Sequence, residues 1–255
     1  MLHYPTLRVD DLIVEYRNME NLFGIIENFV LDIYESSSLS CGGVVIDIGA
    51  GIGDYSLLAS KKVGKKGRVI AIEPNPFDYE ILLKNITANS ATNVFPINVG
   101  ISNSHGYDSI EFAGERFTFA TMLLREVLRK FDVRLYQLPS YCKIDVEGYE
   151  TRIIQESADV MCGFDEIAIE LHGTKTSIDD LLLPLGFRFR SIKHFNLRHK
   201  MLKHAVFHPL LSYDLYTQVK FNLKRPLINY LLGDFDIVRK SGLMVGKYVK
   251  DNSSR

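Results

Sequence analysis

A run of apolar residues followed by three alternately spaced glycines is the feature that most constrains this chain. Four of the five residues 44–48 are apolar, which predicts a short strand buried on both faces. Gly49, Gly51 and Gly53 follow, and a helical pattern then begins. Glycine suits this position because a chain that turns at once from strand to helix passes through backbone angles that side chains resist. Bare backbone also admits a ligand to the free N–H groups of the helix, so we expect a nucleotide-type cofactor loop.

The glycine spacing separates two kinds of nucleotide site. The dinucleotide fingerprint G-x-G-x-x-G would need glycine at position 54, where the chain has Asp54. The pattern of Asp47 and the three glycines instead resembles the first motif of S-adenosylmethionine-dependent methyltransferases.

A second predicted strand, residues 68–73, ends in Glu73, 20 residues after Gly53. A carboxylate at that distance is typical of the group that binds ribose hydroxyls. The alternatives are a purely structural turn and a solvated acid at a strand end.

Composition indicates a soluble α/β domain. The chain has 255 residues, 46% hydrophobic and 24% charged, which is enough to bury one large core. It has no stretch of 18 apolar residues, and we expect neither a membrane-spanning helix nor a signal peptide. Three unclustered cysteines (Cys41, Cys142, Cys162) suit a reducing compartment and have no metal-binding spacing. We therefore expect a cytoplasmic protein.

The net charge of −1 conceals an uneven distribution of charge. Residues 188–255 hold 14 Lys or Arg and four Asp, a net charge of +10, so the preceding residues carry −11. Such a segment favours contact with something anionic, namely a phosphorylated substrate, a nucleic acid or a membrane face. The alternative is a basic surface that is simply solvated.

Strands and helices alternate from residue 44 to residue 192, which predicts an open, mainly parallel sheet covered on both faces. We expect three parts: a helical lead-in (1–43), a cofactor-binding core (44–192) and a basic C-terminal segment (193–255) that shapes substrate access. Residues 100–118 are expected to be mostly loops. The predicted strands are 44–48, 68–73, 93–98, 109–112, 141–145, 166–171 and 187–192, and the predicted helices 18–34, 54–62, 77–88, 121–131, 148–161 and 177–185.

The stretch 194–233 has the least distinct pattern. It contains His194, His199, His204 and His208, whose spacings match no metal-ligand motif, so surface or substrate-facing roles are favoured. Short amphipathic helices are expected there. Residues 236–249 are expected to form a last strand pair that turns at Ser241-Gly242.

Residues 143–150, KIDVEGYE, give a more specific resemblance. They are similar to the K-I-D-V-E-G-x-E signature of FkbM-family methyltransferases. The same family has D-x-G-A-x-x-G, found here at 47–53, and E-P-N-P, found here at 73–76. It also has an acidic residue on the fifth strand, matched here by Glu170. The resemblance covers residues 20–192; the family usually has Asn where this chain has Gly51.

The resemblance implies a Rossmann-like class I methyltransferase fold, with a mostly parallel seven-stranded sheet and helices on both faces. It implies S-adenosylmethionine as cofactor. The backbone of the glycine loop would hold its methionine part and Glu73 its ribose hydroxyls. Asn75 or Phe77, with Asn98 and Val99, would flank its adenine. The implied cofactor-binding residues are Asp47, Gly49, Ala50, Gly51, Gly53, Glu73, Pro74, Asn75, Phe77, Asn98 and Val99.

Four residues near the ends of the fourth and fifth strands are candidates for catalysis: Asp145, Glu147, Glu170 and His172. Asp145 and Glu147 are candidates for the base that takes a hydroxyl proton or for groups that orient the acceptor. A carboxylate that caps a helix is the structural alternative. Asp145, Glu170 and His172 also form a candidate divalent-metal set, but we do not expect a metal, because His172 serves equally well as a hydrogen-bond donor.

The resulting hypothesis is O-methylation of a hydroxyl on a sugar, a lipid-linked glycan or a secondary metabolite, with N-methylation as a variant. RNA methylation is an alternative, motivated by the basic C-terminal segment, and a non-catalytic binding module that retains the fold is another. A dehydrogenase is disfavoured by the glycine spacing. The acceptor and the oligomeric state stay open.

Overall fold

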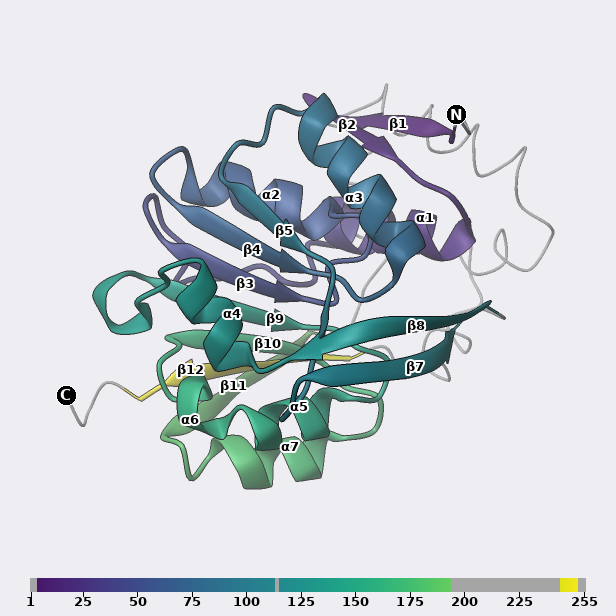
Figure 1. Cartoon of the computed structure of the whole chain (residues 1–255). Coiled ribbons are helices and arrows are strands. Elements are labelled where there is room, and N and C mark those ends of the chain that lie inside the picture. The colour runs from purple at the N-terminus through teal and green to yellow at the C-terminus, as the bar shows by residue number, and fades with distance from the viewer. Residues whose placement is uncertain (1–3, 113–114, 194–243, 252–255) are drawn as a thin grey trace, which may run out of the picture.

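A seven-stranded sheet forms the centre of the computed structural model, which describes residues 4–112, 115–193 and 244–251 (Figure 1). The first predicted strand lies in its middle, buried along its whole length. In spatial order the strands are β11 (Phe187–Lys193), β12 (Val245–Lys250), β10 (Glu166–Glu170), β9 (Ser140–Ile144), β3 (Val44–Ile48), β4 (Arg68–Ile72) and β5 (Val94–Ile97).

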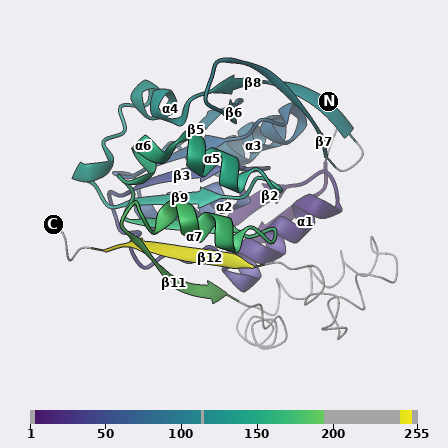
Figure 2. The same ribbon diagram turned by 90° about the horizontal axis from the view of Figure 1, so that it is seen from below.

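The strand order reverses beside β3. The chain runs from β3 outward to β4 and β5, and then returns to β9 on the other side of β3. Neighbouring strands from β10 to β5 are parallel, while β12 is inserted antiparallel between β10 and β11. Figure 2 shows β12 beside β11. This confirms the predicted Rossmann-like, mostly parallel sheet. Ligands bind such sheets at the carboxyl ends of the strands, where the order reverses.

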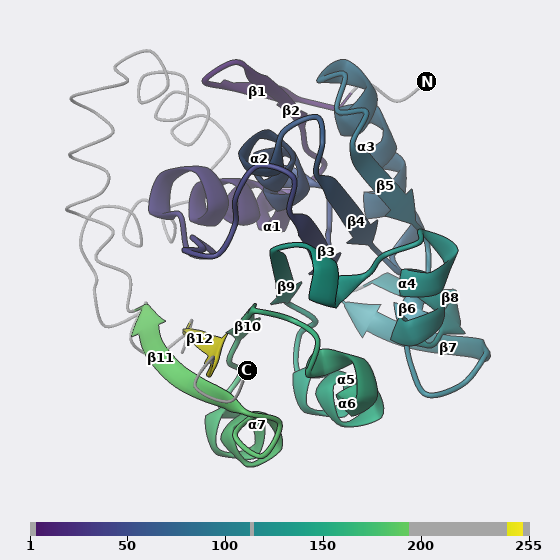
Figure 3. The same cartoon turned by 90° about the vertical axis from the view of Figure 1, so that its left-hand side faces the viewer.

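Alternate residues of each central strand enter two separate cores, because successive side chains point to opposite faces. On β3, Val45 packs on one face, whereas Ile46 and Ile48 pack on the other. Figures 1 and 3 show the two helical layers. One layer has α2 (Asp54–Val63) and α3 (Pro76–Ala88), and the other has α4 (Leu124–Lys130), α5 (Glu150–Glu156), α6 (Ala158–Met161) and α7 (Lys175–Leu182).

The N-terminal lead-in differs from the single helix predicted over 18–34. It consists of a hairpin of β1 (Thr6–Val9) and β2 (Leu12–Glu15), then α1 (Met19–Ile25), which widens into the π-helix η1 (Ile26–Leu31). The helix ends at Asp32, whose φ of 50° is left-handed. Apolar periodicity does not distinguish an α-turn from the wider π-turn, since both present one side to the core.

The prediction for residues 100–131 was wrong in two places. The short strand predicted over 109–112 is confirmed within β7 (Gly106–Phe112), but the loops expected around it are strands too. β8 (Glu115–Met122) pairs antiparallel with β7, and the short strand β6 (Gly100–Ile101) pairs parallel with β8. The helix predicted over 121–131 therefore begins only at Leu124. Figure 1 shows β7 and β8 extending beside the main sheet, at the side where α1 lies.

The helix predicted over 148–161 is divided at Ser157 into α5 and α6. The 3₁₀ turn η2 (Leu135–Gln137) precedes β9. The predictions for 194–233 and for the turn at Ser241-Gly242, and most of the basic C-terminal segment, lie outside the described residues. None of the helices in the described ranges is both long and apolar enough to cross a membrane.

Asn85 of α3 and Asn89 at the C-cap of this helix hold the N-terminal hairpin in place. The Asn85 side chain accepts a hydrogen bond from Glu15 N (2.7 Å) and donates to Glu15 O (3.0 Å) and to Ile52 O (2.9 Å) in the glycine loop. Asn89 bonds Ile13 N and Ile13 O in the same way, at 2.8 and 2.6 Å. Asn85 and Asn89, four residues apart in the chain, thus bind Glu15 and Ile13, which are two residues apart on β2.

We predict that Asn85→Ala lowers the free energy of unfolding by about 2 kcal/mol or more, because it leaves buried backbone groups unpaired. Urea denaturation measures this change. The matched control is Thr87→Ala, at an exposed position of the same helix, which should shift stability by no more than about 0.5 kcal/mol. Equal effects of the two variants would contradict the bridging role of Asn85.

Candidate functional site

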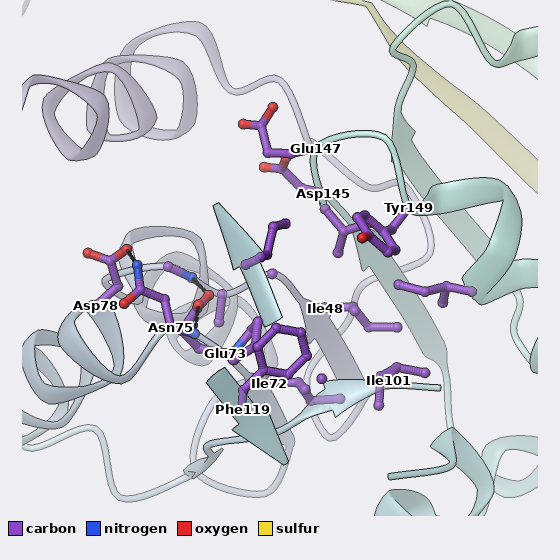
Figure 4. Close-up of a pocket in the computed structure, with 18 of the residues that line it drawn as sticks. Ile48, Ile72, Glu73, Asn75, Asp78, Ile101, Phe119, Asp145, Glu147 and Tyr149 are labelled. Carbon is purple, nitrogen blue, oxygen red and sulfur yellow. Dashed lines mark hydrogen bonds between the residues drawn. The ribbon is translucent and has the colours of Figure 1, made fainter. Parts of the chain in front are cut away.

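A cavity of about 600 Å³ opens at the carboxyl ends of the central strands. This volume lies within the range of about 300–1,000 Å³ that is typical of small-molecule and cofactor sites. Its walls come from the ends of β3, β4, β9 and β10, from α1 and η1, and from the β7–β8 pair. Figure 4 shows Glu73 and Asn75 on one side, Asp145 and Glu147 on another, and Ile48, Ile72 and Phe119 on a third.

The glycine loop needs its glycines for two different reasons. A Cβ on Gly49 would lie 1.7 Å from the Asp145 carbonyl oxygen, and the φ of Gly49 is +76°. A Cβ on Gly53 would lie 2.3 Å from Leu82 Cδ1 of α3. Both therefore permit close packing within the protein. Gly51 has nothing within 4 Å of its Cβ position and lines the cavity, so its backbone is accessible to a ligand.

Glu73 joins the end of β4 to the glycine loop. One carboxylate oxygen accepts from Gly51 N at 2.6 Å and the other from Asn75 N at 2.7 Å. Burial raises the pKa of Glu73 to about 8, although both backbone hydrogen bonds favour the charged form. Asn75 caps α3 through Phe77 N (3.0 Å) and donates to Asp78 (2.9 Å). This side of the cavity thus offers fixed carboxylates to hydroxyl donors.

The β7–β8 pair supplies an apolar wall that the sequence prediction missed. Phe117 and Phe119 of β8 and Ile110 of β7 line the cavity together with Ile72 and Val99, and Figure 4 shows Phe119 beside Ile72. The alternation of polar and apolar residues at 116–119 (Arg-Phe-Thr-Phe) was the available signal, since period-2 alternation is typical of a strand with one buried face. Such a wall suits a flat apolar ring system.

Asp47 points away from the cavity and into a buried charge cluster. Lys143 Nζ lies 3.1 Å from Asp47 and 3.4 Å from Asp145, and it donates to Gly49 O at 2.8 Å. Ser56 donates to Asp47 at 2.6 Å. Burial alone would lower the pKa of the Lys143 ammonium. The negative charges nearby, first Asp47 and then Asp145 and Asp54, have the larger effect and hold this pKa above its ordinary value.

Asp145 is the central carboxylate on the side of the cavity opposite Glu73, where several acidic side chains meet. Tyr34 Oη donates to it at 3.0 Å, and Glu170 forms a side-chain hydrogen bond with it. Burial raises the pKa of Asp145, but Lys143 and these hydrogen bonds outweigh burial and lower it. The pKa of Glu170 is raised, first by burial and then by the charge of Asp145. The pair therefore holds one proton, mostly on Glu170, at neutral pH.

His172 lies behind this pair and contacts two further carboxylates. Nδ1 lies 2.8 Å from Glu150, which is fully buried, and Nε2 lies 3.3 Å from Glu147. Hydrogen bonds to Glu147 and then Glu150 raise the pKa of His172 to about 10, so the ring is positively charged at neutral pH. Glu147 adopts a left-handed φ of 51°, and its side chain is half exposed at the cavity.

The structure brings together most of the residues proposed from the sequence. Those that line the cavity are Gly49, Ala50, Gly51, Glu73, Pro74, Asn75, Val99, Asp145, Glu147 and Glu170. Five do not line it: Asp47, Gly53 and His172 have the structural contacts given above, Phe77 is the residue capped by Asn75, and Asn98 donates to Glu73 O (2.7 Å) and Pro74 O (3.1 Å).

Sequence reasoning missed the contribution of the N-terminal helix. Glu27 and Asn28 of η1 line the cavity, Tyr34 reaches Asp145, and Asn28 Nδ2 donates to Asp54 Oδ2 at 2.9 Å. A polar residue such as Asn28 within an apolar helix face was a weak signal, but no motif relates it to a site that begins 20 residues later.

In the described part of the chain, no group of three or more His, Cys, Asp or Glu side chains has a metal-binding arrangement. Asp145, Glu170 and His172, the candidate metal set from the sequence, therefore do not have such an arrangement. The two ring nitrogens of His172 lie against Glu147 and Glu150.

Comparison with protein-family models gives one match, to the family described as "Methyltransferase FkbM domain", over residues 47–191, which is more than half of the chain. The match includes the glycine loop, Glu73, the KIDVEGYE segment and Glu170. No match was found among curated protein sequences.

Several solved structures are similar to this chain. The methyltransferase FkbM from Methylobacillus flagellatus KT is 17% identical, with a TM-score of 0.43 over 67% of this chain and 50% of that one. A SAM-dependent methyltransferase from Aquifex aeolicus is 15% identical, with a TM-score of 0.44 over 68% and 88%. A precorrin-6y C5,15-methyltransferase from Geobacter metallireducens GS-15 is 19% identical, with a TM-score of 0.40 over 62% and 70%.

We predict that Lys143→Met strongly destabilises the protein, by about 3–5 kcal/mol, because Asp47 stays buried and loses its opposite charge, with only the Ser56 hydrogen bond left. Urea denaturation at pH 7 measures the loss. The double variant Asp47→Asn/Lys143→Met removes both charges and should recover part of it. A double variant less stable than the single one would contradict this assignment.

We predict that His172 stabilises the fold most at low pH. Its pKa is raised from 6.5 to about 10, so the folded state binds the proton more tightly than the unfolded state. The stabilisation is complete below pH 6.5 and is lost as pH rises toward 10. The difference in unfolding free energy between the unmodified chain and His172→Gln, measured from pH 6 to 10, should shrink with pH; a constant difference would contradict the charged ring.

Proposed function

We propose that this chain, which belongs to the family of FkbM methyltransferases, is an S-adenosylmethionine-dependent O-methyltransferase acting on a sugar, a glycan or a secondary metabolite. The main observation in support is that the glycine loop, Glu73 and the Asp145–Glu170 pair all line the same cavity. A donor held by the first group and an acceptor held by the second would meet inside it.

The residues on the loop side fit this cofactor. Glu73 offers buried carboxylate oxygens to ribose hydroxyls, and Gly51 leaves space for a ligand beside the backbone. The apolar wall of Ile72, Val99 and Phe119 suits the adenine ring. When bound, the cofactor supplies an electrophilic methyl group on a sulfonium, so the protein mainly has to position a nucleophile.

The acid side can orient an acceptor and take its proton. In this proposal Asp145, which is ionised, accepts a hydrogen bond from the acceptor hydroxyl and so directs its oxygen. Because Asp145 and Glu170 hold one proton between them, the pair has room for the proton that the hydroxyl loses on methylation. Glu147 contributes a third carboxylate at the exposed edge.

The charge of the cavity supports an acceptor without phosphate groups. Carboxylates outnumber basic side chains among the lining residues, and the ammonium of Lys143 is already paired with Asp47 and Asp145. A polyanion such as RNA would be repelled at this site. RNA methylation therefore depends on the basic C-terminal segment and is the weaker of the two proposals.

We predict that the chain binds S-adenosylhomocysteine in isothermal titration calorimetry and that Glu73→Ala weakens binding at least about tenfold, because the hydrogen bonds to the Glu73 carboxyl oxygens are lost. Asp145→Asn should retain binding within about threefold but lose transfer of labelled methyl groups to a panel of sugars and metabolites. Binding of NAD in place of the methyl donor would overturn the proposal, and turnover unaffected by Asp145→Asn would remove the role of that residue.

A further inference from the structure

The cavity has an apolar end for which the proposed cofactor does not account. Beyond the residues that suit adenine, six apolar side chains, here called the apolar slot, line the same cavity: Ile101, Ile110, Phe117, Val146, Tyr149 and Ile153. In Figure 4, Ile101 and Tyr149 lie at the other side of the view from Asn75 and Asp78. Tyr149 is 40% exposed, and partly exposed apolar side chains that gather in a cavity indicate a ligand.

The β7–β8 pair supplies one part of the apolar slot. Successive side chains of a strand point to opposite faces, and one face of this pair lines the cavity. On that face Ile110 and Phe117 are register partners, and the rings of Phe117 and Phe119 have centroids 5.9 Å apart. Phe117 is only 8% exposed, yet among the described residues it belongs to neither core of the main sheet. These residues therefore serve the cavity and not a core.

The segment that leads into α5 supplies another part. Val146 follows Asp145 directly, and Tyr149 is the N-cap of α5. Ile153 lies four residues further on, and its backbone N donates to Tyr149 O at 3.0 Å, so both side chains share one side of the helix. The apolar slot thus begins one residue away from the carboxylate that, in the proposed function, binds the acceptor hydroxyl.

Polar side chains that line the same cavity near these elements have partners within the protein. Thr121 Oγ1 of β8 donates to Ser104 O at 2.9 Å, and Arg152 Nε of α5 donates to Glu156 at 2.9 Å. A sugar ring held in the apolar slot would bury hydroxyl groups against hydrocarbon, which is costly for each group left unpaired. A hydrocarbon group has no such cost, and its burial is favourable.

We propose that the apolar slot holds a hydrocarbon group of the acceptor, a chain or a ring, beside the hydroxyl that is methylated. The inference rests on the proposed function and narrows its acceptor class. An alcohol with a hydrocarbon body is preferred over a free sugar, whose hydroxyl groups surround the whole ring.

Nuclear magnetic resonance of the full chain, labelled at the isoleucine δ1 methyl groups, tests this proposal. Ile101, Ile110 and Ile153 report from the apolar slot, and Ile81, buried in the core on the other face of the sheet, is the reference. Cyclohexanol and myo-inositol have the same six-membered carbon ring but carry one and six hydroxyl groups. Both are titrated into the complex with S-adenosylhomocysteine, as are butan-1-ol and hexan-1-ol.

Two variants of the apolar slot are compared with matched controls. Tyr149→Ser removes the exposed ring, and its control is Tyr107→Ser, at a position of β7 that is 82% exposed and does not line the cavity. Val146→Thr replaces a methyl group by a hydroxyl of similar size. Its control is Val133→Thr, since both valines are partly buried against the same core but Val133 does not line the cavity.

We expect cyclohexanol to shift the three reporter methyl signals, to leave that of Ile81 in place, and to bind at least about tenfold more tightly than myo-inositol. Each added methylene of the linear alcohols should strengthen binding about three- to fourfold. Tyr149→Ser and Val146→Thr should each weaken cyclohexanol binding roughly 3- to 10-fold. Neither control should change it, and all four variants should bind S-adenosylhomocysteine like the unmodified chain.

Three results would overturn the inference. They are reporter signals that no alcohol shifts, myo-inositol bound as tightly as cyclohexanol, and variants of the apolar slot that have no more effect than their controls. Failure of the unmodified chain to bind S-adenosylhomocysteine counts against the proposed function instead. Cyclohexanol and myo-inositol titrated into the free protein, with the same reporter signals, then decide whether the apolar slot binds hydrocarbon.

Discussion

The ion cluster around Lys143 is the interaction on which the rest of the site depends. Its ammonium lies between Asp47 of β3 and Asp145 at the end of β9, and it also binds the carbonyl of Gly49. It therefore joins the two strands at the point where the strand order reverses, and it fixes the first glycine of the loop. Burial of three charges is tolerated because each one has partners. The cavity thus begins from a rigid base.

The N-terminal segment closes the cavity from the other side. Asn85 and Asn89 attach the hairpin to α3, and Asn28 attaches η1 to Asp54 at the start of α2. Tyr34, after η1, donates to Asp145. A region outside the family match therefore sets the hydrogen bonds of the central carboxylate. Residues 4–34 are for this reason part of the site and not merely a lead-in to it.

Local sequence patterns predicted the core strands and the glycine loop because each of these depends on one property of nearby residues. Continuous apolar runs are buried wherever they pair, and a turn as tight as that at Gly49 accepts only glycine. Only residues 109–112 of the β7–β8 pair were predicted as a strand, because its apolar residues face a cavity and not the main core, so its pattern is short and mixed. The π-turn of η1 was missed because its periodicity is close to that of an α-helix. His172 lies beside Glu170, but it is bound to Glu147 and Glu150 and does not line the cavity.

By itself, the sequence determined the strand–helix alternation, the positions of the glycine loop and Glu73, and the acids that follow the fourth and fifth strands. These features depend on residues close together in the chain. Only the tertiary structure decided which of those acids lie at the cavity, that Asp47 faces Lys143 and not a ligand, and that Glu27 and Asn28 border the site. The reason is physical: the burial and charge of a group depend on its neighbours in space, and here those neighbours lie up to 111 residues away, as Tyr34 does from Asp145.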